Sequence, residues 1–285
     1  MNNSAALQSV AGTALRILFN PALTGTALRC CASIFRNFFG LQYWGLLSGK
    51  IPVSRADHLL DEKIPFDPSR VKIYMDFSAF WIRCQGFLLR RFGAAAENEV
   101  RNFLAAIGRL YAFAAGVYER NLSTTRRPRY LKDFRFRLIH TFDPHLMCIP
   151  SLHVMVMILS YTRFRKSISV MRAEKDCAAR CAEIDRGARD ITEAVLFVKQ
   201  HSVNCIAAAM YAMTCFDGEL FPPAEAEAFL SALFTGSLPD KDAEAVRGHI
   251  KNLYERFLDE GKNTEDWTRP LLNFLASQPA AEKKK

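Results

Sequence analysis

Apolar residues dominate long stretches of the first three quarters of the chain, and polar segments separate these stretches. Such stretches, in a chain with only 14 Gly and 12 Pro, are typical of packed helices. They lie at residues 27–47, 73–89, 103–118, 146–162 and 194–216. We expect an all-α fold, a helical bundle in which these stretches pack together.

Polar residues interrupt each apolar stretch. Arg109, His153, Lys199 and His201 are examples, and the longest charge-free run, at 146–162, is shorter than the roughly 20 residues that a spanning helix needs. In a membrane, an Arg or Lys at the bilayer centre costs about 2.5–3.5 kcal/mol unless it faces the bundle interior. Hydropathy therefore leaves two interpretations open: soluble core helices, or a membrane bundle whose polar residues line a site.

The last quarter of the chain has the pattern of an ordinary soluble helix. Its apolar residues recur at three- and four-residue steps, at Ala243, Val246, Ile250, Leu253, Tyr254 and Phe257. Asp240 is expected to cap this helix and Gly261 to end it. A short helix is expected to start near Pro270, with Trp267 as a packing anchor.

Charge is distributed unevenly. The formal charge is +9, with 29 Lys and Arg against 16 Asp and Glu before residue 217 and 9 against 13 from there on. A basic bundle suits an anionic partner, which can be nucleic acid, an anionic membrane surface or a phosphorylated substrate. The basic residues form no single helical stripe interleaved with aromatic residues and no nucleic-acid motif, so we expect no nucleic-acid partner.

These changes in pattern and charge predict three parts. Residues 1–58 form an N-terminal apolar and basic helical segment, 59–216 a helical bundle, and 217–285 a small soluble helical appendage. A composition of 50% hydrophobic and 24% charged residues excludes a disordered chain. The eight cysteines contain no CxxC pair, so we expect no metal site and no cofactor.

Three separated groups of polar residues carry the candidate chemistry. They are Arg120 with Arg127, Ser151 with His153, and Lys199 with His201. Two guanidiniums can clamp a phosphate through charge-assisted hydrogen bonds, and a lysine adds a point charge. Two imidazoles can supply a nucleophile and a proton donor. Together these groups are typical of metal-free phosphoryl transfer.

The order and spacing of these groups resemble the type 2 phosphatidic acid phosphatase superfamily, whose three motifs are KxxxxxxRP, PSGH and SRxxxxxHxxxD. Arg120 stands in place of the first Lys, and Arg127-Pro128 matches. The second motif is PSLHV here, and the third matches around KQHSV from Lys199, a form similar to the inositol phosphorylceramide synthase-like branch. The segment LDEKIPF from Leu60 also resembles that branch, so the resemblance covers residues 60–211.

The resemblance implies a membrane phosphatase or phosphotransferase that acts on a lipid phosphate through a phosphohistidine intermediate. His201 would be the nucleophile and His153 the acid that protonates the leaving oxygen. The groups that would surround the phosphate are Arg120, Arg127 and Ser151, with Lys199 as a substitute ligand. The resemblance also implies a multi-pass bundle in a bacterial-type inner membrane, with no metal or cofactor.

Two positions depart from the third motif. Its Arg is Val195 here, and its Asp is Cys205. In the family that carboxylate holds the nucleophilic imidazole in its attacking tautomer, and loss of the equivalent carboxylate in serine proteases costs about 10⁴ in rate. On a continuous helix, Asn204 and Cys205 would share a face with His201, so both are candidate acceptors for its ring N–H.

Three functions therefore remain. The first is the lipid phosphatase or phosphotransferase. The second is a catalytically impaired member of the same family that binds anionic lipid or phosphate without turnover. The third, a soluble basic helical protein that binds nucleic acid, is supported by net charge alone. The sequence makes no prediction of oligomeric state.

Overall fold

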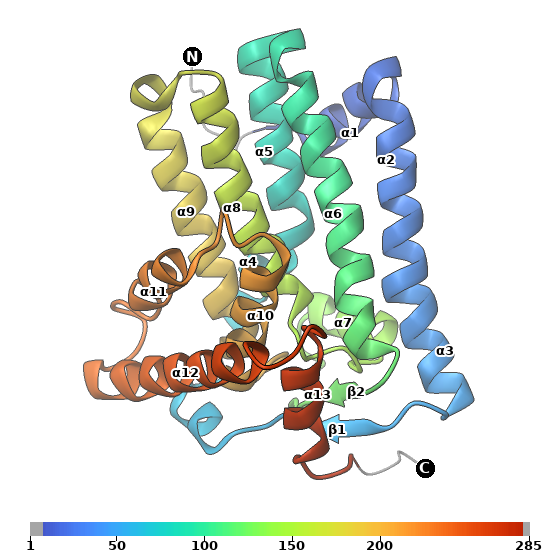
Figure 1. Ribbon diagram of the computed structural model, residues 1–285, viewed down its shortest axis with the longest axis vertical. Helices are drawn as coiled ribbons and strands as arrows, with labels where there is room; N and C mark the ends of the chain where they lie inside the picture. Colours follow the sequence, from blue (N-terminus) through green and yellow to red (C-terminus); the bar gives the residue numbers. More distant parts are fainter. Residues whose placement is uncertain (1–7, 282–285) are drawn as a thin grey trace.

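The computed structural model describes residues 8–281, which fold predominantly into α-helices (Figure 1). The prediction of a predominantly helical bundle is confirmed. The helices are α1 (Val10–Leu18), α2 (Pro21–Ile34), α3 (Leu41–Ser48), α4 (Val71–Met75), α5 (Phe77–Phe92), α6 (Glu97–Tyr118), α7 (Phe134–Phe142), α8 (Leu152–Val170), α9 (Glu174–Phe197), α10 (Val203–Phe216), α11 (Pro223–Ser231), α12 (Asp240–Gly261) and α13 (Arg269–Ala276).

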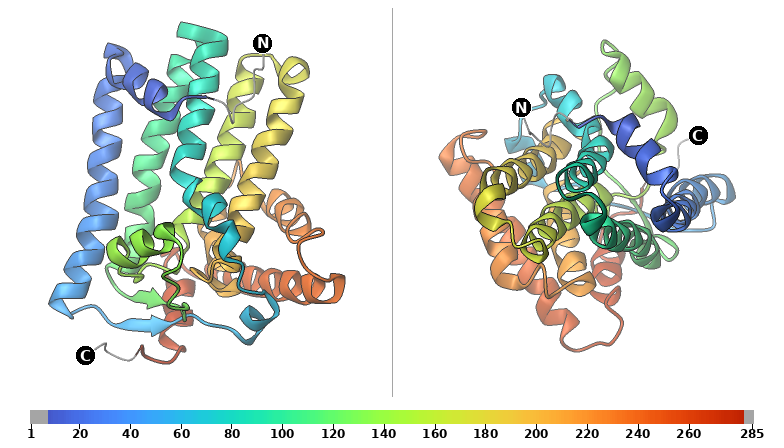
Figure 2. Two further views of the ribbon diagram at one scale, coloured as in Figure 1. Left: turned by 180° about the vertical axis from the view of Figure 1, so that it is seen from behind. Right: turned by 90° about the horizontal axis from the view of Figure 1, so that it is seen from above.

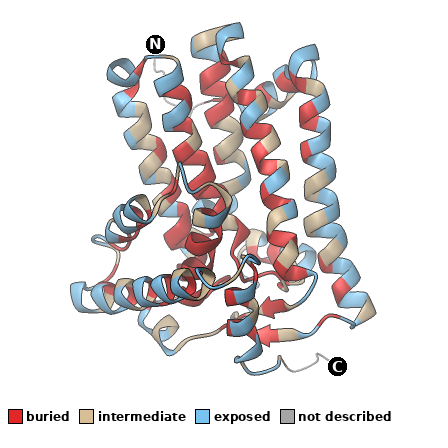
Figure 3. Cartoon of the chain, in the orientation of Figure 1, coloured by how far each residue is buried: buried red, intermediate tan, exposed pale blue. Residues whose placement is uncertain are grey.

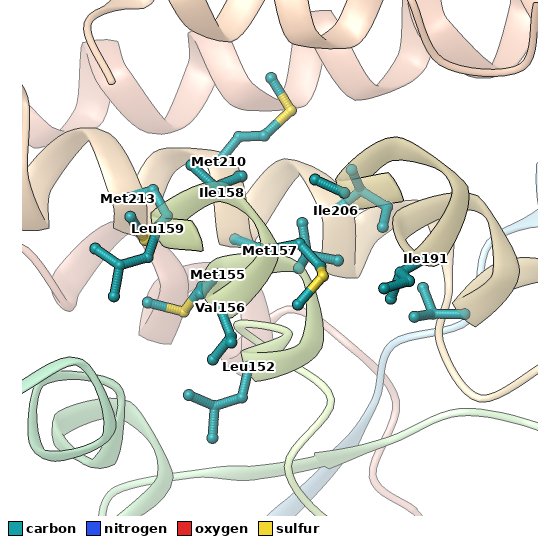
Figure 4. Packing of buried hydrophobic residues seen from close by; sticks show 14 of the residues in the cluster. Leu152, Met155, Val156, Met157, Ile158, Leu159, Ile191, Ile206, Met210 and Met213 are labelled. Carbon is teal, nitrogen blue, oxygen red and sulfur yellow. The ribbon is translucent and has the colours of Figure 1, made fainter. Parts of the chain in front are cut away.

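Helix α8 forms the centre of the molecule. It packs against α5, α6, α9 and α10, and these neighbours surround it in the view from above (Figure 2). Every residue from Val154 to Thr162 is buried, and the Leu, Met, Ile and Val side chains of this segment interlock with those of α9 and α10 (Figure 4). A helix that is apolar all round is buried on all sides. Residues 152–162 of the predicted apolar run therefore lie in the innermost helix of the bundle.

The N-terminal part lies along one side of the bundle. A π-helical turn, Phe35–Gly40, joins α2 to α3, so the helix runs on without a break along α6. The Ser33 hydroxyl donates to the backbone carbonyl of Gly108 in α6 over 2.6 Å. Gly45 allows α3 to approach strand β2 closely, because a Cβ there would lie 2.6 Å from the side chain of Leu122.

A short parallel ladder, which the sequence did not predict, joins distant segments near the lower end of the bundle. Strand β1 (Val53–Arg55) pairs in register with β2 (Leu122–Thr124), with Ser54 opposite Ser123. Ser123 is fully buried and binds the segment that leads into α8: its hydroxyl accepts from the backbone N–H of Ile149 over 2.7 Å. On its other edge β1 hydrogen-bonds to residues 279–281.

The C-terminal helices cross the lower end of the bundle against α10, and they bury one face while the other is exposed (Figure 3). The predicted helix is confirmed as α12, and the predicted short helix as α13. The prediction that Asp240 caps α12 is wrong, because Pro239 is at the N-cap and Asp240 lies in the first turn. Trp267 stacks on Phe113 of α6 with ring centroids 3.7 Å apart, which confirms it as a packing anchor.

None of the helices formed by residues 8–281 combines the length and the apolar character that crossing a bilayer requires. The expectation that Arg109 faces the bundle interior is wrong, because its side chain is exposed. Arg109 follows Gly108 on the outer part of α6, where charge is readily solvated. Of the other interruptions, His201 is buried, and His153 and Lys199 are half-buried.

Candidate active site

Three of the predicted residues meet at the lower end of α8. The Nε2 atom of His201 lies 3.2 Å from the Ser151 hydroxyl and 3.3 Å from Nδ1 of His153. The two imidazoles are edge to face, with ring centroids 5.4 Å apart. Residues 48 positions apart in the chain therefore form one hydrogen-bonded group.

Local sequence explains how these residues are held. Ser151 is the N-cap of α8, so its side chain sits where the helix begins and His153 lies in the first turn. Ser202 caps α10, which places His201 in the turn between α9 and α10 rather than on a helix. Both helix ends lie beside each other because α8 and α10 pack together. The group is thus built from one helix start and one interhelical turn.

Aromatic rings enclose His153. Its imidazole stacks on Tyr74 with centroids 4.8 Å apart and lies 4.2 Å from the ring of Phe77. Burial lowers the pKa of His153 to about 4. Burial also holds the pKa of His201 well below its ordinary value, and the neighbouring His153 adds to this effect. Both imidazoles are therefore neutral at pH 7.

Arg127 belongs to the same region and is held by two acceptors. Its Nη1 donates to Oε1 of Gln200 over 3.1 Å, and its Nη2 donates to the backbone carbonyl of Asp143 over 2.9 Å. The Asp143 carboxylate also lies 3.6 Å from Nη1. Since a guanidinium has five N–H donors, Arg127 keeps donors for an anion.

The space between these groups is small. A cleft of about 20 Å³ is lined by Phe38, Gln42, Tyr74, Asp143, His145, Met147, Cys148, Leu152, His153, Gln200 and His201. This volume holds about one water molecule. A phosphoryl group is larger, so the two imidazoles must separate before a substrate can enter.

The position that a carboxylate occupies in the family is unfilled. The Nδ1 atom of His201 is buried and has no hydrogen-bond partner among the described residues. Asn204 donates to the carbonyl of Ala56 and pairs with His249 at 2.8 Å, while the Cys205 sulfur accepts from the backbone N–H of Ser202. Neither therefore accepts from His201. The helix begins only at Val203, so the i+3 and i+4 geometry of a continuous helix does not apply.

Two predicted phosphate ligands have partners elsewhere. The Arg120 side chain is 55% exposed and donates to Asp266 over 2.7 Å and to Thr268 over 2.9 Å. The Lys199 ammonium donates to the backbone carbonyls of Asp61 and Ile64, which fixes the loop before α4. The cleft is thus lined by His153 and His201, with Ser151 hydrogen-bonded to His201 and Arg127 bound to the lining residues Gln200 and Asp143. Arg120, Lys199 and Asn204 do not line it.

Three other residues of this region were not predicted. Asp143 and His145 come from the loop before α8, and Gln42 comes from α3. The sequence FDPHL held a signal for His145, since a histidine eight residues before His153 lies in the loop that leads into α8. Nothing in the sequence indicates that Gln42 reaches the cleft, because that depends on how α3 packs.

Among residues 8–281 no group of three or more His, Cys, Asp or Glu side chains has an arrangement suited to a metal ion. Comparison of the chain with protein families, with curated proteins and with solved structures found no match. The case for a function therefore depends on the geometry of the cleft and on the three motifs.

Proposed function

We propose that the protein is a phosphatase or phosphotransferase that acts on a lipid phosphate through a phosphohistidine. One observation carries the proposal: Ser151 and His153 of the second motif form one hydrogen-bonded group with His201 of the third, and Arg127 of the first motif binds Gln200, the neighbour of His201. A nucleophile, a proton donor and a nearby cation are the parts that metal-free phosphoryl transfer needs.

The roles follow from the contacts. Nε2 of His201 faces the other two residues of the group and attacks phosphorus, while the bond from phosphorus to the leaving oxygen breaks. A protonated His153 gives its proton to that oxygen. Ser151 and Arg127 donate hydrogen bonds to the remaining phosphoryl oxygens. In the second step His153 takes a proton from water or an alcohol, whose oxygen attacks phosphorus and releases His201.

The same geometry supports a second function, binding of an anionic lipid or phosphate without turnover. The observation that favours it is the unpaired Nδ1 of His201. No carboxylate pairs with Nδ1, so no negative charge stabilises a phosphorylated ring there; the backbone of Cys148 is the neighbouring hydrogen-bonding group that favours the charged imidazole. Arg127 and Ser151 hold an anion equally well in either case.

An apolar surface supports a lipid as the substrate. The outward face of α2, the π-helical turn and α3 exposes large apolar side chains at Leu28, Phe35, Phe39, Tyr43, Trp44, Leu46 and Leu47. The outward face of a surface helix usually carries polar residues, so this apolar face is unusual. Residues 1–56 contain no Asp or Glu, and Arg29 and Arg36 are exposed on the same face. Apolar and basic residues together suit an anionic bilayer surface.

Turnover tests the proposal. Purified full-length protein is incubated with phosphatidic acid, an isoprenoid phosphate and a chromogenic monoester, and released phosphate is measured. We expect release by the wild type and by a His140→Ala control on α7, and at least a hundredfold loss in His201→Ala. If wild type and His201→Ala release phosphate equally, phosphoryl transfer at this site is wrong. Binding of the lipid phosphate without release would support the second function.

A further inference from the structure

Two polar side chains in the cleft take no part in the reaction described above. Gln42 comes from α3 and His145 from the loop between α7 and α8, and both line the cleft beside His153 and His201. Gln42 is 1% exposed and His145 is 6% exposed. Gln42 lies outside the region that resembles the phosphatases, so the N-terminal segment contributes a wall of the cleft.

Gln42 carries a buried donor without an acceptor. Its Oε1 accepts a hydrogen bond from the backbone N–H of Leu146 over 3.2 Å, which settles which way the amide points. Its Nε2 then has no partner among the described residues. An unpaired buried donor opposes folding, so such a group calls for a partner that the protein itself does not supply.

His145 is held firmly in the same wall. Its backbone has φ of +63°, a left-handed conformation that is costly outside glycine and that clusters at functional sites. Its Nε2 lies 2.9 Å from the Thr125 hydroxyl, and its Nδ1 lies 3.9 Å from the Asp143 carboxylate. The backbone N–H of His145 also donates to Asp143 over 2.9 Å.

The surroundings of His145 favour its charged form. The titratable and charged groups that face it are Asp143, Cys148, Arg127, His153 and His201. Burial opposes a charge on the imidazole, but Cys148 and Asp143 outweigh burial and raise the pKa of His145 to about 9. A positive charge therefore lines the cleft at pH 7.

We propose that Gln42 and His145 form an anion-binding subsite in the cleft, available once the imidazoles of His153 and His201 have separated. The Gln42 amide donates to an oxygen of a phosphoryl group, and the positive charge of His145, whose ring nitrogens face Thr125 and Asp143, attracts that group. The unpaired group, Nε2 of Gln42, is a hydrogen-bond donor. Asp143 is the one carboxylate among the described residues of the cleft wall, and it already pairs with Arg127 and His145. The wall therefore suits an anion rather than a cation. The subsite lies in the cleft of the proposed function and does not depend on turnover.

Anion titrations of the full-length protein test the subsite. The probes are inorganic phosphate and sulfate, and calorimetry gives the dissociation constant at pH 7. Gln42→Glu keeps the acceptor for Leu146 but replaces the donor with a negative charge, and His145→Gln removes the positive charge. We expect each variant to bind both anions at least tenfold more weakly. Lys132→Gln, which removes an exposed charge outside the cleft, should change binding less than twofold.

A pH series distinguishes attraction of the anion by charged His145 from a purely structural role of His145 in the loop before α8. Sulfate remains a dianion between pH 6 and 10, so a change in its affinity reports on the protein. Wild-type affinity should fall as pH rises through about 9, because His145 loses its proton there, and His145→Gln should lack this fall. The wild-type series decides the question even if a variant fails to fold.

The outcomes distinguish the two proposals. Unchanged anion affinity in both folded variants, or a wild-type affinity that is flat up to pH 10, overturns the subsite even if the protein turns over substrate. Anion binding that depends on Gln42 and His145, with no phosphate release by the wild type, supports the subsite and contradicts phosphoryl transfer.

Discussion

The missing carboxylate beside His201 is the most consequential feature at the scale of single residues. Its buried Nδ1 lacks an acceptor, and a buried unpaired polar group of this kind costs about 1–3 kcal/mol. Cys205 is fully buried and close in sequence, and burial raises its pKa well above the ordinary value, so it offers no negative charge. The proposed nucleophile and the proposed acid therefore lie together without a carboxylate to orient the nucleophile.

Restoring the carboxylate should raise activity. We predict that Cys205→Asp increases the rate of phosphate release about 10- to 100-fold, because a carboxylate buried four residues after His201 adds a negative charge that stabilises the phosphorylated ring. Cys205→Ser, similar in size and uncharged, is the control and should match the wild type. An active wild type that Cys205→Asp leaves unchanged shows that the site works without a carboxylate.

The pKa of His153 predicts an acidic pH optimum. The acid must be protonated, and with a pKa of about 4 its protonated fraction rises roughly tenfold for each pH unit between 7 and 5. His201, whose pKa is lowered further, stays neutral over this range and remains a nucleophile. A profile of kcat/KM against pH should therefore climb toward pH 5, and the climb should be absent in His153→Gln.

The lowered pKa of His153 also makes the folded protein less stable in acid, which limits the pH range of the assay. The unfolded chain binds a proton at His153 near pH 6.5, whereas the folded protein does so only near pH 4. Stability therefore falls as pH drops below about 6.5. Thermal unfolding should be measured at each pH. A kcat/KM that is highest above pH 7 in folded protein contradicts the role of His153 as the acid.

At the scale of elements, the sequence predicts which segments are helices and not how they meet. The pattern from Asp240 to Gly261 predicts α12 because its apolar residues keep one helical period. The ladder of β1 and β2 could not be predicted, since three-residue strands carry too little alternation. The pairing of Arg120 with Asp266 depends on where α13 packs, which no local pattern encodes.

A glycine-to-alanine substitution in α3 tests its close contact with β2 through the free energy of unfolding. Gly45→Ala places a Cβ 2.6 Å from Leu122, which is fully buried and cannot move aside freely, so we predict a loss of about 1–3 kcal/mol. Gly248→Ala on α12 meets no atom within 4 Å and should stabilise by about 0.5–1 kcal/mol. Chemical denaturation measures both changes. Equal effects of the two substitutions would show that α3 does not pack against β2 as described.

At the scale of the whole molecule, the motifs converge because the bundle brings together helix ends from opposite parts of the chain. Motif order predicted that Ser151, His153 and His201 meet, and the structure brings them within hydrogen-bonding distance. Sequence could not predict how narrow the cleft is or that Gln42 lines it. Both features depend on packing between segments about 100 residues apart.

The exposed face of α2 and α3 predicts attachment to anionic bilayers. Full-length protein should sediment with vesicles that contain phosphatidylglycerol and remain in solution with neutral vesicles at 0.1 M salt, because Arg29 and Arg36 lie among apolar side chains. The triple variant Phe35→Ser, Phe39→Ser, Trp44→Ser should lose at least tenfold in partitioning. A triple variant that still binds the vesicles contradicts a lipid surface.

The edge of β1 that pairs with residues 279–281 has a consequence for synthesis. Strand β1 emerges from the ribosome more than two hundred residues before its final partner. The hydrogen bonds between β1 and residues 279–281 therefore cannot form for most of translation. Nascent chains arrested before residue 279 should therefore expose this strand to chaperones. Full protection of its backbone amides from exchange is expected only once that last partner has been made.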